Sequence, residues 1–169
     1  MTKLAIYKYH ATGDADAARQ HLRNLLGRFG DTGKKLSAEY ELDTYIAWAE
    51  RNDLIVADRK VRIEYDLGSG VLLGGEVSRV DVDVVGGGYR AILLGAHDPD
   101  WGAELRTPLL QRAVAQHFDR NESEVMVGVQ SLDGTALETL WFTTAEIDEA
   151  DVQARALAIL LAAEWARQA

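Results

Sequence analysis

The spacing of the apolar residues changes near Asn52, and this change restricts the folds open to the chain. Before it, apolar residues recur every three or four positions, as on one face of a helix; these are Ala38, Leu42, Tyr45, Ile46 and Ala49. After it, apolar and polar residues alternate, as in residues 61–65. Helical spacing returns after Thr107. Segments with helical spacing and segments with strand-like alternation thus occupy separate parts of the chain, which predicts an α+β domain.

The first fifty residues predict a short strand followed by two helices. Residues 4–7 are apolar and form the predicted strand. Asp14 is a suitable cap for a helix over residues 14–29, and Ser37 for a second helix over residues 37–51. Between them, residues 30–35 are mostly polar and contain two glycines, which is typical of a linker.

The rest of the chain predicts several strands and two further helices. Strands are expected at residues 54–57, 61–65, 80–84, 89–96, 124–130 and 137–142, and helices at residues 107–118 and 143–167. The apolar run over residues 89–96 indicates a strand buried on both faces. Hairpin signals at Gly86-Gly87-Gly88 and Asp133-Gly134 predict an antiparallel sheet with the helices packed on one side.

Charge divides the chain into a basic strand–helix segment, residues 1–36, and an acidic α+β domain, residues 37–169. The whole chain has a net charge of −9, with +4 on residues 1–36 and −13 on the remainder. An acidic body repels nucleic acid and anionic membranes and favours basic partners. The basic segment docks on this body, forms a solvated basic face or binds nucleic acid, and the sequence leaves these alternatives open.

The cysteine count and the apolar runs bear on location. The chain contains no cysteine, which excludes disulfides, thiol catalysis and thiolate metal sites. Residues 1–8 hold no apolar run of signal-peptide length, and the longest apolar run, residues 156–163, is too short to span a bilayer. We therefore expect a cytoplasmic protein with no membrane partner.

The closing helix has more apolar surface than one packed face requires. We expect an inward stripe consisting of Val152, Ala156, Ile159, Leu160 and Ala163. Leu157, Leu161 and Trp165 widen it into a second face. This second face is either deeply buried in the monomer or a surface for contact with a partner or a second copy.

Three carboxylates are the best candidates for a metal site. Glu76, Asp81 and Asp83 belong to one strand region, and hard cations bind several carboxylate oxygens. The order helix, acidic hairpin, helix, strand would suit a degenerate metal-dependent nuclease core. Such sites usually need a nearby lysine, but the last lysine is Lys60, and residues 91–93 are apolar where a second acid and the lysine are expected. The alternative is the solvent face of a half-exposed strand.

His97 adds a fourth candidate metal ligand, beside Asp98 and Asp100 in a predicted loop. The same residues are also ordinary turn chemistry around Pro99. No serine lies in a nucleophile elbow, and no glycine loop carries the lysine of a phosphate-binding loop. We therefore predict no catalytic residue and no cofactor.

The order of the later elements follows that of a known fold. Residues 89–94 resemble a buried strand before a middle helix, residues 109–118 resemble that helix, and residues 125–142 resemble the hairpin before a closing helix. In this order and in its apolar spacing, the stretch from Val61 to Trp165 resembles the type III secretion chaperone fold. The resemblance implies a non-enzymatic dimer that holds an extended partner segment on an exposed apolar surface.

Taken together, the sequence predicts a non-catalytic protein-interaction module, similar to a chaperone or an adaptor, that forms a homodimer and binds a basic or extended protein partner. Contact is expected through the closing helix or the middle helix; the candidate residues are Leu157, Leu161, Trp165, Leu109, Val114 and Phe118. Two alternatives stay open. One is a metal-dependent hydrolase using Glu76, Asp81, Asp83 or His97, and the other is an acidic mimic of nucleic acid.

Overall fold

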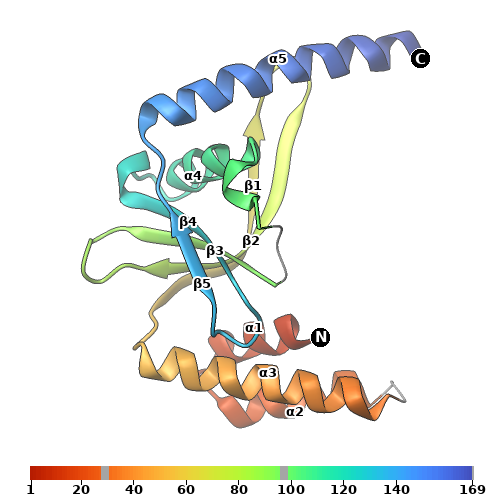
Figure 1. Cartoon of the computed structure of the whole chain (residues 1–169), viewed down its shortest axis with the longest axis vertical. Helices are drawn as coiled ribbons and strands as arrows, with labels where there is room; N and C mark the ends of the chain where they lie inside the picture. The colour runs from red at the N-terminus through yellow and green to blue at the C-terminus, as the bar shows by residue number, and fades with distance from the viewer. Residues whose placement is uncertain (28–30, 96–98, 169) are drawn as a thin grey trace.

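The computed structural model describes residues 1–27, 31–95 and 99–168. Three helices come first, α1 (Thr2–Thr12), α2 (Ala15–Leu26) and α3 (Thr32–Arg51). Strands β1 (Val56–Asp66), β2 (Leu72–Val82) and β3 (Tyr89–Leu94) follow. After a short 3-10 turn come α4 (Arg106–His117), β4 (Val125–Gln130), β5 (Leu137–Leu140) and the long helix α5 (Thr144–Gln168) (Figure 1).

The five strands form one mixed sheet in the order β1-β2-β3-β4-β5. β3 and β4 are parallel, with Ala91 opposite Val127, while the other neighbouring pairs are antiparallel. The α+β class is confirmed, but the wholly antiparallel sheet is wrong for this one pair. In the chain, α4 follows β3 and precedes β4, and it returns the chain to the end of the sheet where β3 began. This lets β4 run parallel to β3, whereas a hairpin can only join antiparallel strands.

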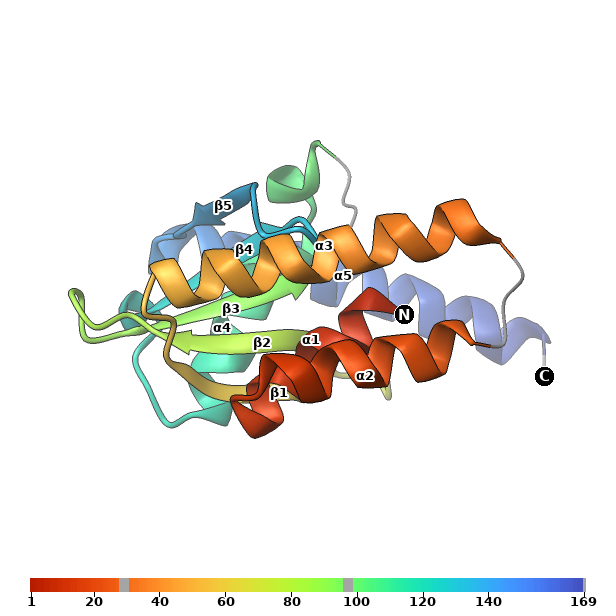
Figure 2. The same cartoon turned by 90° about the horizontal axis from the view of Figure 1, so that it is seen from below.

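Helices cover both faces of the sheet, with α1–α3 on one side and α4 and α5 on the other (Figure 2). Ile92 of β3 packs in the core beneath α1–α3, and Ala91 packs in the core beneath α4. The prediction of helices on one side is therefore wrong. The burial of β3 on both faces, predicted from its unbroken apolar run, is confirmed.

Residues 4–7 lie in α1, so the predicted strand is wrong. α1 buries Thr2, Ala5 and Ile6, which are three and four positions apart as one helical face requires. Four consecutive apolar residues do not distinguish a strand from a buried helix. The cap of α2 is confirmed, because the Asp14 carboxylate accepts hydrogen bonds from the amides of Asp16 and Ala17.

α3 begins at Thr32, ahead of the predicted cap Ser37, and includes most of the predicted linker. Asp31 caps it by accepting hydrogen bonds from the amides of Gly33 and Lys34. The boundary predicted after residue 36 thus falls inside a helix. Ile6 of α1 and Leu22 of α2 pack in the same core as α3, so residues 1–36 belong to the domain.

β1 is one continuous strand where two short strands were predicted, and β2 starts at Leu72, ahead of the strand predicted from residue 80. Gly74 and Gly75 pair with Glu64 and Ile63 across the β1–β2 hairpin, so they are strand residues. None of the helices in the described ranges is long and apolar enough to cross a membrane.

Candidate interaction surface

The first half of α5 is fixed to the body of the domain. Thr143 and Glu146 form a capping box at the start of α5, in which the Thr143 amide donates to the Glu146 carboxylate at 2.7 Å. Four buried residues then face the body: Ile147, Ala150, Ala154 and Ala158. Three of the four are alanines, and small side chains allow α5 to approach its neighbours closely.

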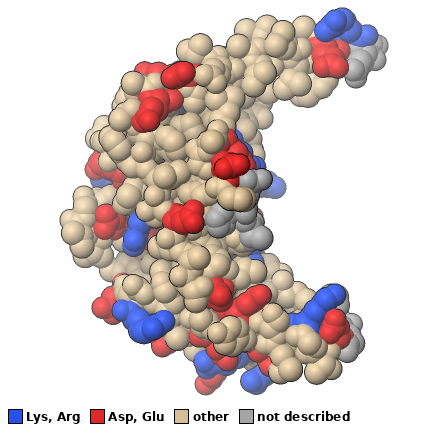
Figure 3. Space-filling model, in the orientation of Figure 1, with Lys and Arg blue, Asp and Glu red and all other residues tan. Residues whose placement is uncertain are grey.

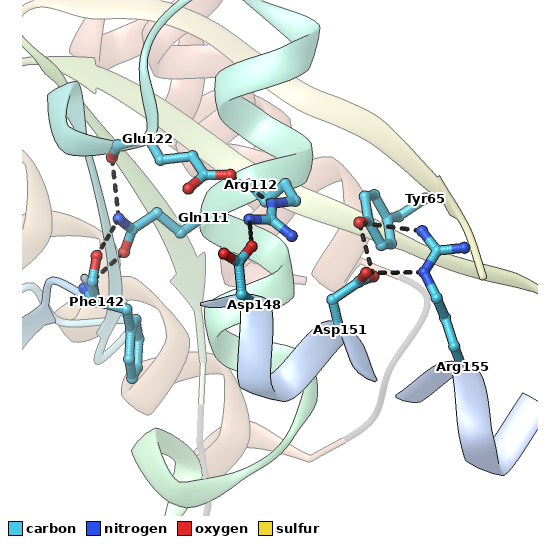
Figure 4. Close-up of polar contacts among 8 residues, drawn as sticks. All are labelled: Tyr65, Gln111, Arg112, Glu122, Phe142, Asp148, Asp151 and Arg155. Carbon is cyan, nitrogen blue, oxygen red and sulfur yellow. Dashed lines mark hydrogen bonds and ion pairs between the residues drawn. The ribbon is translucent and has the colours of Figure 1, made fainter. Parts of the chain in front are cut away.

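Polar contacts hold the same half of α5 and the segment before it (Figure 4). Gln111 of α4 is buried, donates to the carbonyls of Glu122 and Phe142 at 2.9 Å, and accepts from the amide of Phe142 at 2.9 Å. Arg112 forms ion pairs with Glu122 and Asp148. The hydrogen bond to Glu122 is the main cause that raises the pKa of the Arg112 guanidinium, so it stays charged.

A second set of contacts joins α5 to β1 (Figure 4). The Tyr65 hydroxyl donates to Asp151 at 2.8 Å, and Arg155 donates to the other oxygen of Asp151 at 2.8 Å. Burial acts to raise the pKa of Asp151, but the hydrogen bonds from Arg155 and Tyr65 hold it below its ordinary value. Beyond these contacts α5 extends past the body (Figure 1).

The free half of α5, residues 157–167, carries exposed apolar residues on two sides. We call Leu157, Leu161 and Trp165 the inner stripe, because Leu161 and Trp165 continue the line of the buried Ala154 and Ala158. Their side chains are 44 to 57% exposed. The arm formed by α5 carries few charged residues on the face seen in Figure 3, and it borders the concave side of the molecule.

The outer stripe consists of Val152, Ala156, Ile159, Leu160 and Ala163 and lies on the opposite side of α5. All five residues are exposed, and the three larger ones are 58 to 68% exposed. The prediction that this stripe faces inward is wrong. Both faces of α5 have helical apolar spacing, and the side with alanines at the contact positions is the one that packs on the body.

The middle helix does not offer the predicted contact surface. Leu109 and Val114 of α4 are 1% and 0% exposed and belong to the core. Phe118 is partly buried, with its ring 5.1 Å from that of Tyr89. The sheet and α5 cover α4, so this half of the predicted contact site is wrong.

The candidate metal ligands are not brought together. Glu76 accepts a hydrogen bond from Tyr7 at 3.1 Å, and Asp83 accepts one from the amide of Val85 at 3.3 Å. Asp81 is buried against Arg79. His97 lies outside the described residues. Within the described ranges, no three His, Cys, Asp or Glu side chains are grouped as a metal site requires.

Asp81 is part of a buried network that the sequence did not reveal. Two nitrogens of Arg79 contact the Asp81 carboxylate at 2.5 and 2.7 Å, and a third donates to the hydroxyl of Tyr45 on α3. His10 of α1 contacts that hydroxyl at 2.7 Å. Burial raises the pKa of Asp81 while the hydrogen bonds from Arg79 oppose this. One feature of the sequence could have revealed this network: Arg79 precedes Asp81 by two positions in a strand that is otherwise rich in valine.

A cavity of about 370 Å³ lies between α4 and the β2 and β3 strands. Leu93, Leu94 and Gly95 line it at the end of β3, and Glu76, Glu104 and Arg106 also line it. Leu93 ends the apolar stretch, residues 91–93, where a nuclease core was expected to carry an acid and a lysine. β3 therefore adds neither a carboxylate nor an amine to the cavity beside Glu76 and Glu104.

Comparison with known proteins bears on the fold alone. Neither the family models nor the curated proteins include a match. Among solved structures, the chain is similar to a "putative exonuclease" from Eubacterium rectale, with a TM-score of 0.50 and 13% sequence identity. The match covers 92% of this chain and 64% of that chain, so this chain spans less than two thirds of its length. The resemblance to type III secretion chaperones stays a prediction.

Proposed function

We propose that the chain is a non-catalytic protein-interaction module, in which the inner stripe of α5 binds an apolar segment of a protein partner. The observation that carries this proposal is the free half of α5, where Leu157, Leu161 and Trp165 extend a buried seam into solvent. An exposed apolar stripe that continues a buried one is normally a contact surface for other protein. Tryptophan is also among the residues that contribute most to binding at interfaces.

The charge of the body favours a basic partner. The net charge of −9 attracts positively charged segments and repels nucleic acid. Full burial of an exposed leucine contributes roughly 1.5–3 kcal/mol. The three residues of the inner stripe are about half exposed, so they supply only part of what association costs, and charged contacts must add to them. We therefore expect a partner segment with an apolar stripe and basic flanks.

The test places a photo-crosslinking amino acid at Trp165 and, as a matched control, at the exposed Gln153, which lies on neither stripe. We expect a protein that crosslinks at position 165 and not at position 153. The purified partner should then bind the Leu161→Gln variant at least about tenfold more weakly than the original chain, which corresponds to about 1.4 kcal/mol. Equal crosslinking at both positions, or equal affinity for both chains, would contradict the proposal.

A metal-dependent hydrolase is the second candidate, because the fold is similar to that of the Eubacterium rectale protein. The separated positions of Glu76, Asp81 and Asp83 argue against it. A ligand that binds the folded state must raise the melting temperature. We expect millimolar Mg²⁺ or Mn²⁺ to leave the melting temperature unchanged and DNA uncut; a clear rise together with DNA cleavage would favour the hydrolase instead.

A further inference from the structure

The outer stripe of α5 has the spacing of a helix-pairing seam. Val152, Ala156, Ile159 and Ala163 follow one another at intervals of four, three and four residues, which is the repeat that two packed helices share. All four are exposed and lie opposite the buried Ala154 and Ala158. The seam therefore points away from the body of the same chain.

The sizes of the seam residues fit a second copy running in the opposite direction. In such a pair, Val152 lies opposite the partner's Ala163, and Ile159 lies opposite the partner's Ala156. Each large side chain thus meets a small one, as close packing of two helices requires. A two-fold axis repeats both contacts, because the same patch serves both copies.

Charge along α5 favours the same direction. The first half of the helix carries Glu146, Asp148, Glu149 and Asp151, whereas the far end carries one acid and one base, Glu164 and Arg167. A parallel pair would place two acidic halves side by side. An antiparallel pair brings Arg167 near the partner's Glu149, and it also opposes the two helix dipoles.

We propose that two copies of this chain form an antiparallel dimer through the outer stripe of α5. The two bodies then lie on opposite sides of the helix pair, and in each copy the inner stripe stays on the side of α5 that carries the buried Ala154 and Ala158. The dimer is thus independent of the partner site on the inner stripe. In this dimer, the second copy covers the outer stripe, which is the most exposed apolar side of α5.

The first experiment is sedimentation of the full chain over a dilution series in the micromolar range. We expect a species of twice 18.6 kDa that dissociates on dilution. Ile159→Glu should weaken dimerisation at least about 30-fold, equivalent to about 2 kcal/mol. Leu161→Glu, on the inner stripe of the same helix, should leave it within about threefold. A strict monomer, or a dimer more sensitive to Leu161→Glu, would overturn the proposal.

The second experiment tests the direction of pairing, and it uses the absence of native cysteine. Val152→Cys and Ala163→Cys are prepared as separate proteins. Antiparallel pairing predicts a disulfide when the two are mixed and little when either is oxidised alone, because only the mixed pair has its sulfurs within reach. Disulfides in each single protein would indicate parallel pairing and contradict the antiparallel dimer. Because neither experiment requires another protein, failure of the partner site would leave both results unaffected.

Discussion

On one face of the sheet, α3 is fixed by a buried charged network, whereas on the other face α5 rests on alanines and on ion pairs that water reaches. Arg79 and Asp81 have side chains that are 0% and 1% exposed. By contrast, the Arg112 and Asp148 side chains are 13% and 64% exposed. Removing Arg79 leaves the Asp81 carboxylate buried and unpaired, whereas removing Arg112 leaves the Asp148 carboxylate in contact with water.

This difference separates a closed face from an open one. The α1–α3 face uses its polar groups internally, since Arg79, Tyr45 and His10 contact one another. The α5 face leaves half of a long helix uncovered. We infer that the first face defines the fold and that the second is available for contacts with other molecules.

The largest effect should follow from breaking the buried pair. Arg79→Met leaves the Asp81 carboxylate buried without its cation, and we expect a loss of about 3–5 kcal/mol in the free energy of unfolding. Urea denaturation at neutral pH measures this loss. The double variant Arg79→Met with Asp81→Leu should recover much of it, because it leaves no buried charge.

Arg112→Met is the matched variant on the other face. Asp148 is largely hydrated but Glu122 is only 21% exposed, so we expect a loss of about 1–2 kcal/mol, smaller than that for Arg79→Met. Equal losses for Arg79→Met and Arg112→Met would show that the two faces are held in the same way, and the contrast between them would be wrong.

A smaller effect should appear as a pH dependence on the closed face. Burial, with repulsion from Arg79 and Arg59, lowers the pKa of His10 from 6.5 to about 3. The unfolded chain then binds more protons, so the stabilising contribution is complete above about pH 6.5 and declines as the pH falls towards 3. We expect the urea midpoint of the original chain to fall more steeply between pH 7 and about pH 5 than that of His10→Gln. Parallel slopes would contradict this.

Much of the architecture could be predicted from local signals. The apolar run of β3 and the Asp14 cap each depend on a few neighbouring residues, and the structure confirms both. The parallel pairing of β3 with β4 and the second helical layer could not be predicted in this way. The strand pairing and the second helical layer both depend on which face of the sheet each helix covers. Hairpin signals in the sequence carry no information about that face.

The candidate site shows the same limit at the level of single residues. Leu157, Leu161 and Trp165 were predicted as a contact surface and are exposed. The outer stripe of α5 was predicted to face inward and instead faces solvent. The two stripes have similar spacing, so spacing alone does not show which one packs on the body. The side that packs on the body carries Ala150, Ala154 and Ala158, and apolar periodicity does not distinguish such small residues from larger ones.

The smallest effect on stability should come from the inner stripe, in keeping with an open face. Leu161→Gln should change the free energy of unfolding by less than about 0.5 kcal/mol, because surface substitutions rarely cost more. Ile147→Gln, a buried position on the same helix, should cost about 3 kcal/mol or more, since it places an amide in the core. Both are measured by urea denaturation at a concentration low enough to exclude association. If Leu161→Gln costs as much as Ile147→Gln, the free half of α5 is part of the folding core, and the inner stripe is not a surface available to partners.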